Sequence, residues 1–382
     1  MSRKVIHGAG TGESTSDLLK VVDLKTHFRT ERGTVRAVDG VSLNLTRGKT
    51  LGVVGESGSG KTILSRSIMG LLPSRNVVRE GHVYYEGTDI VGYSQEDMRK
   101  VWGSEMSMVF QDPMTSLNPV MKIGNQITES LVHHLSMDKT EATETALALL
   151  QSVGIPEPAQ RLEEYPHQLS GGMRQRVTIA IALACGPKIL FADEPTTALD
   201  VTVQAQILNL LQKQQNERHM AMILVTHDLG VVAGRTDDIA VMYAGKIVEQ
   251  APTSVLFDKM KMPYTEALVS SIPKLENKSH TRLEIISGRP PDLVNPPRGC
   301  SFAPRCKYVQ DKCREEEPPL VPAETPGHLY RCWFPVDTAE GRDALARNLA
   351  AIAAKAPPPS APAPSGATPT ETAVAAATAK EI

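Results

Sequence analysis

The chain has 382 residues, which is long enough for one large domain with one or two appended segments. Its 41 lysines and arginines nearly balance its 43 aspartates and glutamates, so the overall charge favours neither nucleic acid nor an anionic membrane surface as a partner. The longest nearly apolar run, Val177–Cys185, is far shorter than the roughly 20 residues that span a bilayer, so we expect a soluble chain that reaches a membrane only through a partner.

Residues 1–17 are polar and rich in glycine, serine and threonine. They lack the apolar core of a secretion signal, so we expect a flexible leader rather than an export sequence. Without such a signal, the five cysteines of the chain should be reduced thiols or metal ligands rather than disulfides.

Three short alternating segments precede the first glycine-rich stretch: Lys20–Leu24, Val35–Val38 and Val41–Leu45. Alternation interrupted by glycines predicts antiparallel strands. Phe28 falls in the expected turn between the first two. An aromatic ring at this place could stack on a purine, but spacing alone favours a packing role.

The most informative stretch is Gly55–Thr62, with the sequence GESGSGKT. It matches the phosphate-binding loop pattern G-x-x-x-x-G-K-S/T, follows the apolar run Leu51–Val54, and precedes the start of a helix at Ile63–Met69. In this context the loop N–H groups and the helix N-terminus face one polyphosphate, the lysine reaches the outer phosphates, and the threonine holds Mg²⁺. The predicted nucleotide-binding residues of the loop are Gly55, Ser57, Gly58, Ser59, Gly60, Lys61 and Thr62.

Further strands are predicted at His82–Gly87 and Glu105–Phe110. Gln111 follows the second of these, where its carboxamide could meet a metal or water at a sheet edge, although alone it is an ordinary loop residue. Residues 114–166 are predicted to form a mostly helical insertion between two strands of the sheet. Within it, Asp138–Glu141 resembles a capping box, and apolar residues follow at helical spacing.

Leu169–Gly172 opens a second helix, Met173–Cys185, which Gly186 and Pro187 end. A serine followed by two glycines at a helix N-terminus provides an anion-ready backbone, but Ser170 can equally be a simple N-cap.

Two later strands end in polar residues. Ile189–Ala192 runs into Asp193, which can hold Mg²⁺ through water beside the phosphate-binding loop, and Glu194, which can act as a general base. A helix is predicted at Val203–Glu217. The strand Met222–Thr226 then ends in His227, a candidate contact for a γ-phosphate.

Taken together in this order, these motifs resemble those of the ATP-binding-cassette (ABC) ATPases. The serine-glycine-glycine signature separates that family from other phosphate-loop NTPases, and the resemblance covers about residues 18–267. The segments QDPMTSLNP at 111–119 and YPHQLSGGMRQR at 165–176 look closest to the ATP-binding subunits of oligopeptide and dipeptide importers. Met173 stands where glutamine is commoner among ABC ATPases, but the importer branch resembled here also carries methionine.

The resemblance implies a role for each matched residue. Phe28 would stack on adenine, the loop residues Gly58–Thr62 would hold the phosphates and Mg²⁺, and Gln111 would sense the metal and couple to the permease. Asp193 would position Mg²⁺, with Glu194 as the catalytic base. His227 would contact the γ-phosphate, and Lys61 with His227 would assist catalysis by neutralising charge.

The signature residues Ser170, Gly171 and Gly172 would close over ATP bound to a different subunit, and Asp200 would lie at the same interface. The resemblance therefore implies a second ABC ATPase subunit, identical or a paralogue, and two transmembrane permease subunits. An extracytoplasmic substrate-binding protein would act indirectly, and no nucleic acid is expected. The chain would lie peripherally at the cytoplasmic face of the cell membrane and hydrolyse ATP to energise peptide import.

The sequence is also compatible with other functions. The cargo could instead be nickel, glutathione or a sugar. A soluble, non-transport ABC ATPase acting on ribosomes or DNA is less favoured, because the chain has one phosphate-binding loop and no long coiled coil between that loop and Ser170.

Beyond residue 268 the chain is rich in proline and cysteine, with Cys300, Cys306, Cys313 and Cys332 at a spacing unlike the paired C-x2-C of common zinc sites. Peptide-importer ATPases resemble this segment too, and some look able to hold an iron–sulfur cluster there. By count, four thiolates suit a 4Fe–4S cluster or zinc equally, and unligated reduced cysteines are a third alternative. Cys185 should be plain packing. Residues 337–382 are rich in alanine and proline and predict a disordered tail, with a short helix possible at Arg342–Lys355.

The predicted fold is therefore an α/β phosphate-loop NTPase of the ABC type with a mixed core sheet and an antiparallel β subdomain. We expect a leader at 1–17, the ATPase domain at 18–267 with a helical signature subdomain at about 114–185, a cysteine-containing module at 268–336, and a tail at 337–382.

Overall fold

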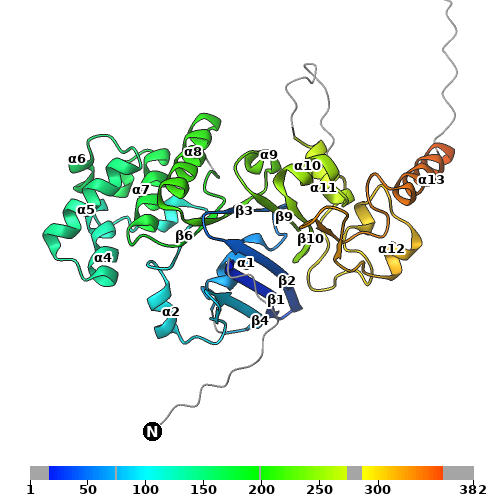
Figure 1. Ribbon diagram of the computed structural model, residues 1–382, viewed down its shortest axis with the longest axis horizontal. Coiled ribbons are helices and arrows are strands. Elements are labelled where there is room, and N and C mark those ends of the chain that lie inside the picture. The colour runs from blue at the N-terminus through cyan, green and yellow to red at the C-terminus, as the bar shows by residue number, and fades with distance from the viewer. Residues whose placement is uncertain (1–16, 74, 198, 273–285, 356–382) are drawn as a thin grey trace, which may run out of the picture.

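The computed structural model describes residues 17–73, 75–197, 199–272 and 286–355 (Figure 1). The expected leader therefore lies almost entirely outside the described residues, as does the part of the expected tail after residue 355. Within the described ranges, no helix has both the length and the apolar character needed to cross a membrane.

The main sheet runs through the middle of the molecule, with the strand order β11-β12-β10-β9-β3-β8-β7-β6 (Figure 1). One run of its strands is parallel, and these strands are buried almost throughout, as expected when both faces of a sheet are covered. The parallel strands are β3 (Thr50–Val54), β6 (Met106–Val109), β7 (Ile189–Asp193), β8 (Ala221–Thr226) and β9 (Asp238–Tyr243). Antiparallel strands extend one edge: β10 (Lys246–Pro252), β11 (Val321–Pro322) and β12 (Leu329–Tyr330).

A second, antiparallel sheet has the order β2-β1-β4-β5. Its strands are β1 (Asp17–Thr30), β2 (Gly33–Thr46), β4 (Val77–Tyr85) and β5 (Thr88–Asp89). The division into three short strands was wrong, because both segments expected at 35–38 and 41–45 lie in β2. Register shifts in the β1–β2 pairing, together with Gly40 at φ 77°, bend a continuous strand. Such bulges interrupt the alternation of apolar and polar residues, and from the sequence alone the interruption resembles a turn.

The position of Phe28 is corrected for the same reason. It lies inside β1, not in a turn, and is paired with Val35 of β2 on one side and Val77 of β4 on the other. Its side chain is half-buried and does not belong to either buried core cluster.

The helices lie around and beyond the main sheet, with α4–α6 at one end of the molecule and α11–α13 at the other (Figure 1). Those before the signature are α1 (Lys61–Ile68), α2 (Gln95–Val101), α3 (Pro113–Ser116), α4 (Ile123–Leu135), α5 (Lys139–Ser152) and α6 (Pro158–Leu162). Those after it are α7 (Gly171–Leu183), α8 (Val201–Arg218), α9 (Leu229–Val232), α10 (Thr253–Lys259), α11 (Pro263–Ser270), α12 (Asp311–Glu315) and α13 (Ala339–Lys355).

The helical insertion predicted between β6 and β7 is present as α3–α6. Its clearest sequence signal was the cap at Asp138, and the Asp138 carboxylate accepts hydrogen bonds from the N–H groups of Thr140 (2.8 Å) and Glu141 (3.0 Å). The apolar face that follows, including Ala142 and Leu150, is buried.

Alternate residues of the parallel strands face two separate hydrophobic clusters. In β7, Leu190 and Ala192 belong to the cluster shared with the helical insertion, whereas Ile189 and Phe191 belong to the cluster beneath the antiparallel sheet. The strand therefore stays in one register, because a shift by one residue would exchange the two faces.

The C-terminal module, residues 286–336 of the described chain, is joined to the main sheet by strand pairing. Glu249 of β10 pairs with Tyr330 of β12. Helix α13 follows at 339–355, close to the short helix that the sequence suggested, and buries Ala344. The Nε2 of Gln310 donates to Asn348 Oδ1 at 3.2 Å, so α13 packs on the module.

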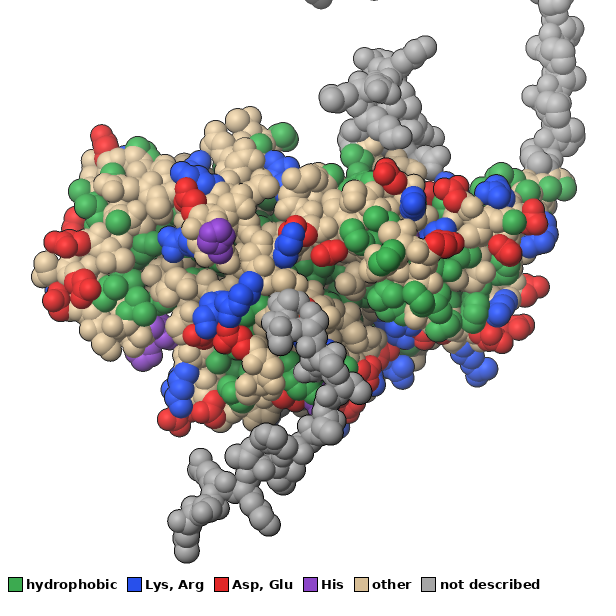
Figure 2. Space-filling view, viewed as in Figure 1, with side chains coloured by type: hydrophobic (Ala, Val, Ile, Leu, Met, Phe, Trp, Pro, Cys, Tyr) green, Lys and Arg blue, Asp and Glu red, His purple; other side chains and the backbone are tan. Residues whose placement is uncertain are grey.

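Figure 2 shows acidic and basic side chains interspersed over one face, as the nearly balanced charge predicts. In this view apolar side chains gather over the end of the molecule that carries the C-terminal module.

Candidate active site

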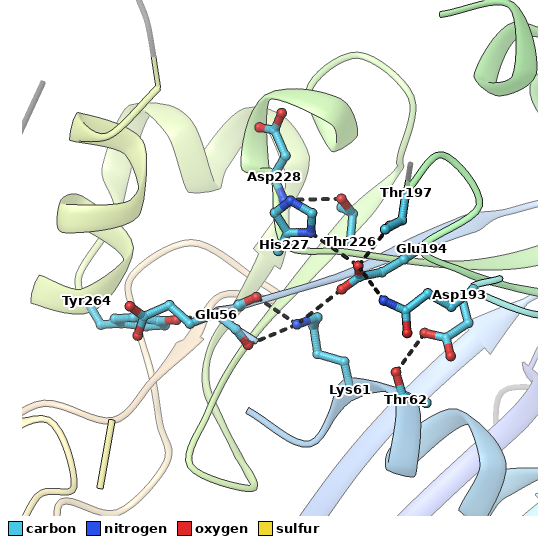
Figure 3. A network of polar contacts seen from close by, with 12 residues as sticks. Glu56, Lys61, Thr62, Asp193, Glu194, Thr197, Thr226, His227, Asp228 and Tyr264 are labelled. Atoms are coloured by element: carbon cyan, nitrogen blue, oxygen red, sulfur yellow. Dashed lines mark hydrogen bonds and ion pairs between the residues drawn. The ribbon is translucent and has the colours of Figure 1, made fainter. Parts of the chain in front are cut away.

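The predicted polar groups meet at the carboxyl ends of the parallel strands (Figure 3). β3 leads into the loop Gly55–Gly60. Its neighbour β8 ends at Thr226, and β7, the next strand beyond β8, ends at Asp193. Gln111 follows β6, the next strand beyond β7. Sheet order thus places four separate segments of the chain around one point, which is where open α/β sheets bind ligands.

Two positions of the loop require glycine. A methyl group at Gly55 would lie 2.1 Å from the carbonyl oxygen of Met242, and one at Gly60 would lie 2.1 Å from the carbonyl oxygen of Ala37. Gly60 also has φ 103°, a conformation that other residues rarely adopt. The loop is therefore wedged between β9 and β2, and its N–H groups lie at the start of α1, as an anion site needs.

Lys61 is the first residue of α1, and its side chain is buried. Its Nζ donates to the carbonyl oxygens of Gly55 (2.8 Å) and Glu56 (3.0 Å), and lies 3.8 Å from Glu194 Oε1 (Figure 3). Burial lowers the pKa of the Lys61 ammonium, while the Glu194, Asp193 and Glu56 charges oppose that shift.

Thr62 and Asp193 form the part of the site that suits a divalent cation. The Thr62 hydroxyl donates to Asp193 Oδ1 at 3.0 Å, and Asp193 is fully buried. Its other oxygen, Oδ2, is buried without a hydrogen-bond partner among the described residues. Burial raises the pKa of the Asp193 carboxyl above its ordinary value. A hydroxyl beside a carboxylate oxygen that lacks a partner is the oxygen-donor set that Mg²⁺ prefers, so these residues fit the metal.

Glu194 is held by residues from three other places in the chain. Its Oε2 lies within hydrogen-bond reach of Gln111 Nε2 (3.1 Å), Thr197 Oγ1 (3.0 Å) and His227 Nδ1 (3.3 Å) (Figure 3). Its backbone has φ 44°, a left-handed conformation that is uncommon outside glycine, and its N–H donates to the Val225 carbonyl at 2.9 Å. The carboxylate is thus fixed at the mouth of the site beside an exposed histidine.

Ser170 is the N-cap of α7, and its hydroxyl accepts the N–H of Met173 at 3.3 Å. A methyl group at Gly172 would lie 2.9 Å from a side-chain carbon of Val203 in α8, so a larger residue here would require that side chain to move. Asp200 is the N-cap of α8, accepting the N–H of Val203 at 2.9 Å.

Several residues that were predicted to bind the nucleotide do not contact the phosphate-binding loop of their own chain. Within the part of the chain it describes, no hydrogen bond or ion pair joins the signature Ser170–Gly172, Asp200 or Phe28 to that loop. The groups that do meet are Gln111, Lys61, Thr62, Asp193, Glu194 and His227.

The metal site expected in the C-terminal module is not supported. The side chains of the four cysteines line one small cavity, but among the described residues no group of three or more His, Cys, Asp or Glu side chains is arranged to hold an ion. Cys185 packs, as expected, against the larger core cluster.

Three residues of the site were not predicted from the sequence. Thr197 lies three residues beyond Glu194 and could have been noticed as a polar group after a strand end. Tyr264 and Arg305 both contact Glu56 of the loop, Tyr264 through its hydroxyl and Arg305 through its guanidinium. Their separations of 208 and 249 residues from Glu56 leave no local signal.

Comparison with known families gives two matches. Residues 38–197 match the ABC transporter family, and residues 248–313 match the C-terminal region of oligopeptide and dipeptide transporters. The first match contains the phosphate-binding loop, the signature and Glu194. The second begins in β10 and includes three of the four module cysteines.

Characterised relatives match over most of their length. The chain is 49% identical over 318 residues to the oligopeptide transport ATP-binding protein OppD of Bacillus subtilis, covering 83% of this chain and 88% of the relative. It is 46% identical over 328 residues to the dipeptide transport ATP-binding protein DppD of Escherichia coli, covering 86% of this chain and 99% of the relative.

Solved structures show the same fold for the larger part of the chain. The dimeric, post-hydrolysis structure of the ATP-binding cassette MJ0796 with ADP and Pi matches at TM-score 0.56 and 28% identity, covering 62% of this chain and 98% of that one. CbiO1 of Clostridium perfringens, part of the transporter complex cbiONQ, matches at TM-score 0.55 and 28% identity, covering 64% of this chain and 92% of that one.

Proposed function

The chain belongs to the ABC transporter ATP-binding proteins of the oligopeptide and dipeptide type, and from that premise we propose that it hydrolyses MgATP to drive peptide import across the cell membrane. The observation that carries this proposal is the convergence of Lys61, the Thr62–Asp193 pair and the Glu194 network at adjoining strand ends. The relatives named for oligopeptide and dipeptide transport supply the cargo class.

In the proposed mechanism, Lys61 exchanges its two loop carbonyl partners for the outer phosphates of ATP. Thr62 Oγ1 and Asp193 would hold Mg²⁺, which would neutralise charge on the transferring phosphoryl group. The N–H groups of Gly58–Lys61 would cradle the phosphates. Positioning and charge neutralisation of this kind account for most of the catalysis in phosphoryl transfer.

Glu194 is proposed as the general base for the attacking water. Its fixed Oε2, together with a left-handed backbone that costs of the order of 1 kcal/mol or more, supports a functional reason for its placement. Gln111 would report whether the metal is in place, and His227 would contact the γ-phosphate. The His227 ring is 60% exposed, so it can reach a ligand that enters from solvent.

A second ATPase subunit would complete the site. Ser170 and Asp200 are exposed at the starts of α7 and α8, where they could meet ATP held by another copy or a paralogue. The dimeric state of the structurally similar MJ0796 cassette supports this arrangement. Phe28 is proposed to stack on adenine from β1, and the half-buried state of its ring leaves a face for that contact.

The permease is proposed to dock at the boundary between the helical insertion and the sheet. A cavity of about 290 Å³ lies there, and none of its lining residues is charged. Trp102, Met108, Phe110 and Ile181 are among the lining residues, and Phe110 is directly followed by Gln111. A short apolar helix of the permease would fit this surface, and its contact with Phe110 would lie one residue from the Glu194 network.

We place the chain peripherally at the cytoplasmic face of the cell membrane, with two permease subunits and, beyond them, an extracytoplasmic substrate-binding protein. The test is to purify the complex gently from its native membrane and measure ATP hydrolysis with candidate cargoes. Stimulation by peptides supports the proposal. Stimulation only by nickel, glutathione or a sugar would reassign the cargo, and recovery without any permease would refute the transport role.

For the C-terminal module we propose that Cys300, Cys306, Cys313 and Cys332 hold a 4Fe–4S cluster. Support comes from their number and from the single cavity that they line, although their present arrangement is not that of a ligand set. Burial raises the pKa of the Cys300 thiol to about 11 and that of Cys306 to about 12, so ligation would have to displace protons. Anaerobic purification followed by iron and sulfide analysis tests this, and zinc alone or no metal would refute it.

A further inference from the structure

We propose that Arg305 of the C-terminal module is a positioning residue for the nucleotide site. Its guanidinium holds the carboxylate of Glu56, the second residue of the phosphate-binding loop, and neutralises a negative charge next to the phosphates. This inference rests on the proposed function, because it concerns how the same loop binds MgATP.

The contact is a two-pronged ion pair. Arg305 Nη1 donates to Glu56 Oε2 at 2.6 Å, and Nη2 donates to Glu56 Oε1 at 2.8 Å. Paired bonds of this kind fix orientation as well as distance, because the planar guanidinium matches the carboxylate. The side chain of Arg305 is 3% exposed and that of Glu56 is 26% exposed, so water screens the pair only in part.

Every N–H of the guanidinium has a partner. Beyond Glu56, Nη1 reaches the Tyr243 hydroxyl (3.3 Å), Nη2 donates to the Ile286 carbonyl (3.2 Å), and Nε donates to the Ser287 carbonyl (3.0 Å). The charged group also lies 5.9 Å from the ring centroids of Tyr243 and Phe302. Arg305 is therefore fixed before a nucleotide arrives, and it fixes the loop in turn.

Glu56 is tied to the site through its backbone as well. Its N–H donates to the Tyr264 hydroxyl at 2.8 Å, and its carbonyl oxygen accepts Lys61 Nζ at 3.0 Å (Figure 3). The same carbonyl accepts the N–H of Ser59 at 3.2 Å. A shift of Glu56 would consequently move the groups that orient Lys61 and the following loop residues.

The negative charge of Glu56 also bears on nucleotide binding. The loop pattern leaves the residue after the first glycine free, and here that residue is an acid in a place that must receive a polyphosphate. An unpaired carboxylate would repel the incoming anion, and at short range this repulsion is strong in a partly buried site. Arg305 cancels that charge from the C-terminal module, so the module contributes to nucleotide affinity without touching the nucleotide.

The module offers a matched control. Arg331 is also anchored to backbone carbonyls, through Nε to Ile247 (3.0 Å) and Nη1 to Pro318 (3.4 Å). No contact of Arg331 with the phosphate-binding loop is present in the described residues. If a general weakening of the module lowers nucleotide affinity, Arg331→Met and Arg305→Met should both raise the Kd for MgATP. If the Arg305–Glu56 pairing is what matters, only Arg305→Met should raise it.

The experiment measures the Kd for MgATP of the full-length chain by calorimetry, and the KM and kcat of the assembled transporter. Arg305→Met should raise Kd and KM roughly tenfold with kcat nearly unchanged, because an uncompensated carboxylate remains beside the phosphates. Adding Glu56→Gln to Arg305→Met should recover most of the loss, since the double variant carries no unpaired charge. Arg331→Met should bind as the wild type does.

The proposal is overturned if Arg305→Met binds MgATP within twofold of wild type, if Glu56→Gln gives no recovery, or if Arg331→Met is weakened equally. Should Arg305→Met fail to fold, Arg305→Lys decides, because it keeps the positive charge but loses the two-pronged pairing: a few-fold rise in Kd supports the pairing, and an unchanged Kd refutes it. A wild-type chain that does not bind MgATP would instead refute the proposed function.

Discussion

Two histidine–glutamate pairs in this molecule show how burial separates a reactive site from a structural clamp. In the nucleotide site, His227 lies 3.3 Å from Glu194, with the histidine 60% and the glutamate 11% exposed. Where the C-terminal module meets β10, His328 of the module lies 2.8 Å from Glu249 of the strand, and the two side chains are 1% and 0% exposed. The residue types are the same, but only the first pair is open to a ligand.

The neighbours of each pair reinforce this difference. Glu194 is surrounded by side chains that can exchange partners, namely those of Gln111, Thr197 and Lys61. Glu249 instead accepts the backbone N–H groups of Lys261 (2.5 Å) and Met262 (3.2 Å), which join β10 to the start of α11. Mutations in the first pair should change turnover, and mutations in the second should change stability.

The largest effect is expected for Glu194→Gln. Loss of the general base should lower kcat of the assembled transporter by roughly a thousandfold, while MgATP still binds. Steady-state hydrolysis and nucleotide retention measure the two quantities. Turnover near the wild-type rate would remove Glu194 from the role of base.

Lys61→Ala should weaken MgATP binding by roughly a hundredfold, because the outer phosphates lose their only buried lysine partner among the described site residues. Calorimetry on the full chain measures this. Lys246→Ala, which removes a lysine from an ion pair with Glu317 in the C-terminal module, serves as control. An unchanged Kd in Lys61→Ala would contradict the assignment of the loop.

Glu249→Gln should lower the free energy of unfolding by about 2 kcal/mol, because a fully buried carboxylate that accepts three hydrogen bonds is replaced by a weaker acceptor. Denaturant titration measures the loss, and the kcat of the folded fraction should not change. A variant that retains full stability but loses turnover would erase the distinction between the two pairs.

The smallest effect concerns pH. Burial raises the pKa of the Asp193 carboxyl, so a proton competes with Mg²⁺ for this carboxylate at higher pH than at an ordinary aspartate. The apparent affinity for Mg²⁺ should therefore be full above the raised pKa and fall a few-fold as pH drops through it. Magnesium titrations at several pH values test this, and Asp193→Asn should lack the dependence.

The nucleotide site was largely predictable because its residues follow individual strands. Asp193, Glu194 and His227 stand directly at strand ends, and Gln111 lies two residues beyond β6; parallel strands in one sheet bring such ends together. Hydrophobic runs mark the strands locally, so the site required no knowledge of distant contacts. The left-handed backbone of Glu194 has no such signal, since it depends on the hydrogen bond to Val225 from the neighbouring strand.

The antiparallel sheet and the C-terminal module were less predictable for a physical reason. Bulges in β1 and β2 break the period of two, which led to Phe28 being assigned to a turn. In the module, the strands β11 and β12 have two residues each, and pairing with β10 fixes them. The contact of Arg305 with Glu56 depends on tertiary structure alone, so no local pattern marks it.

The most direct test of the central claim is ATP-driven uptake of a labelled peptide into liposomes that contain the complete transporter, with ATP on the side that carries this subunit. We predict uptake with the wild-type chain and none with Glu194→Gln, although both bind MgATP. ATP hydrolysis by the wild-type complex without uptake of any peptide would contradict the claim.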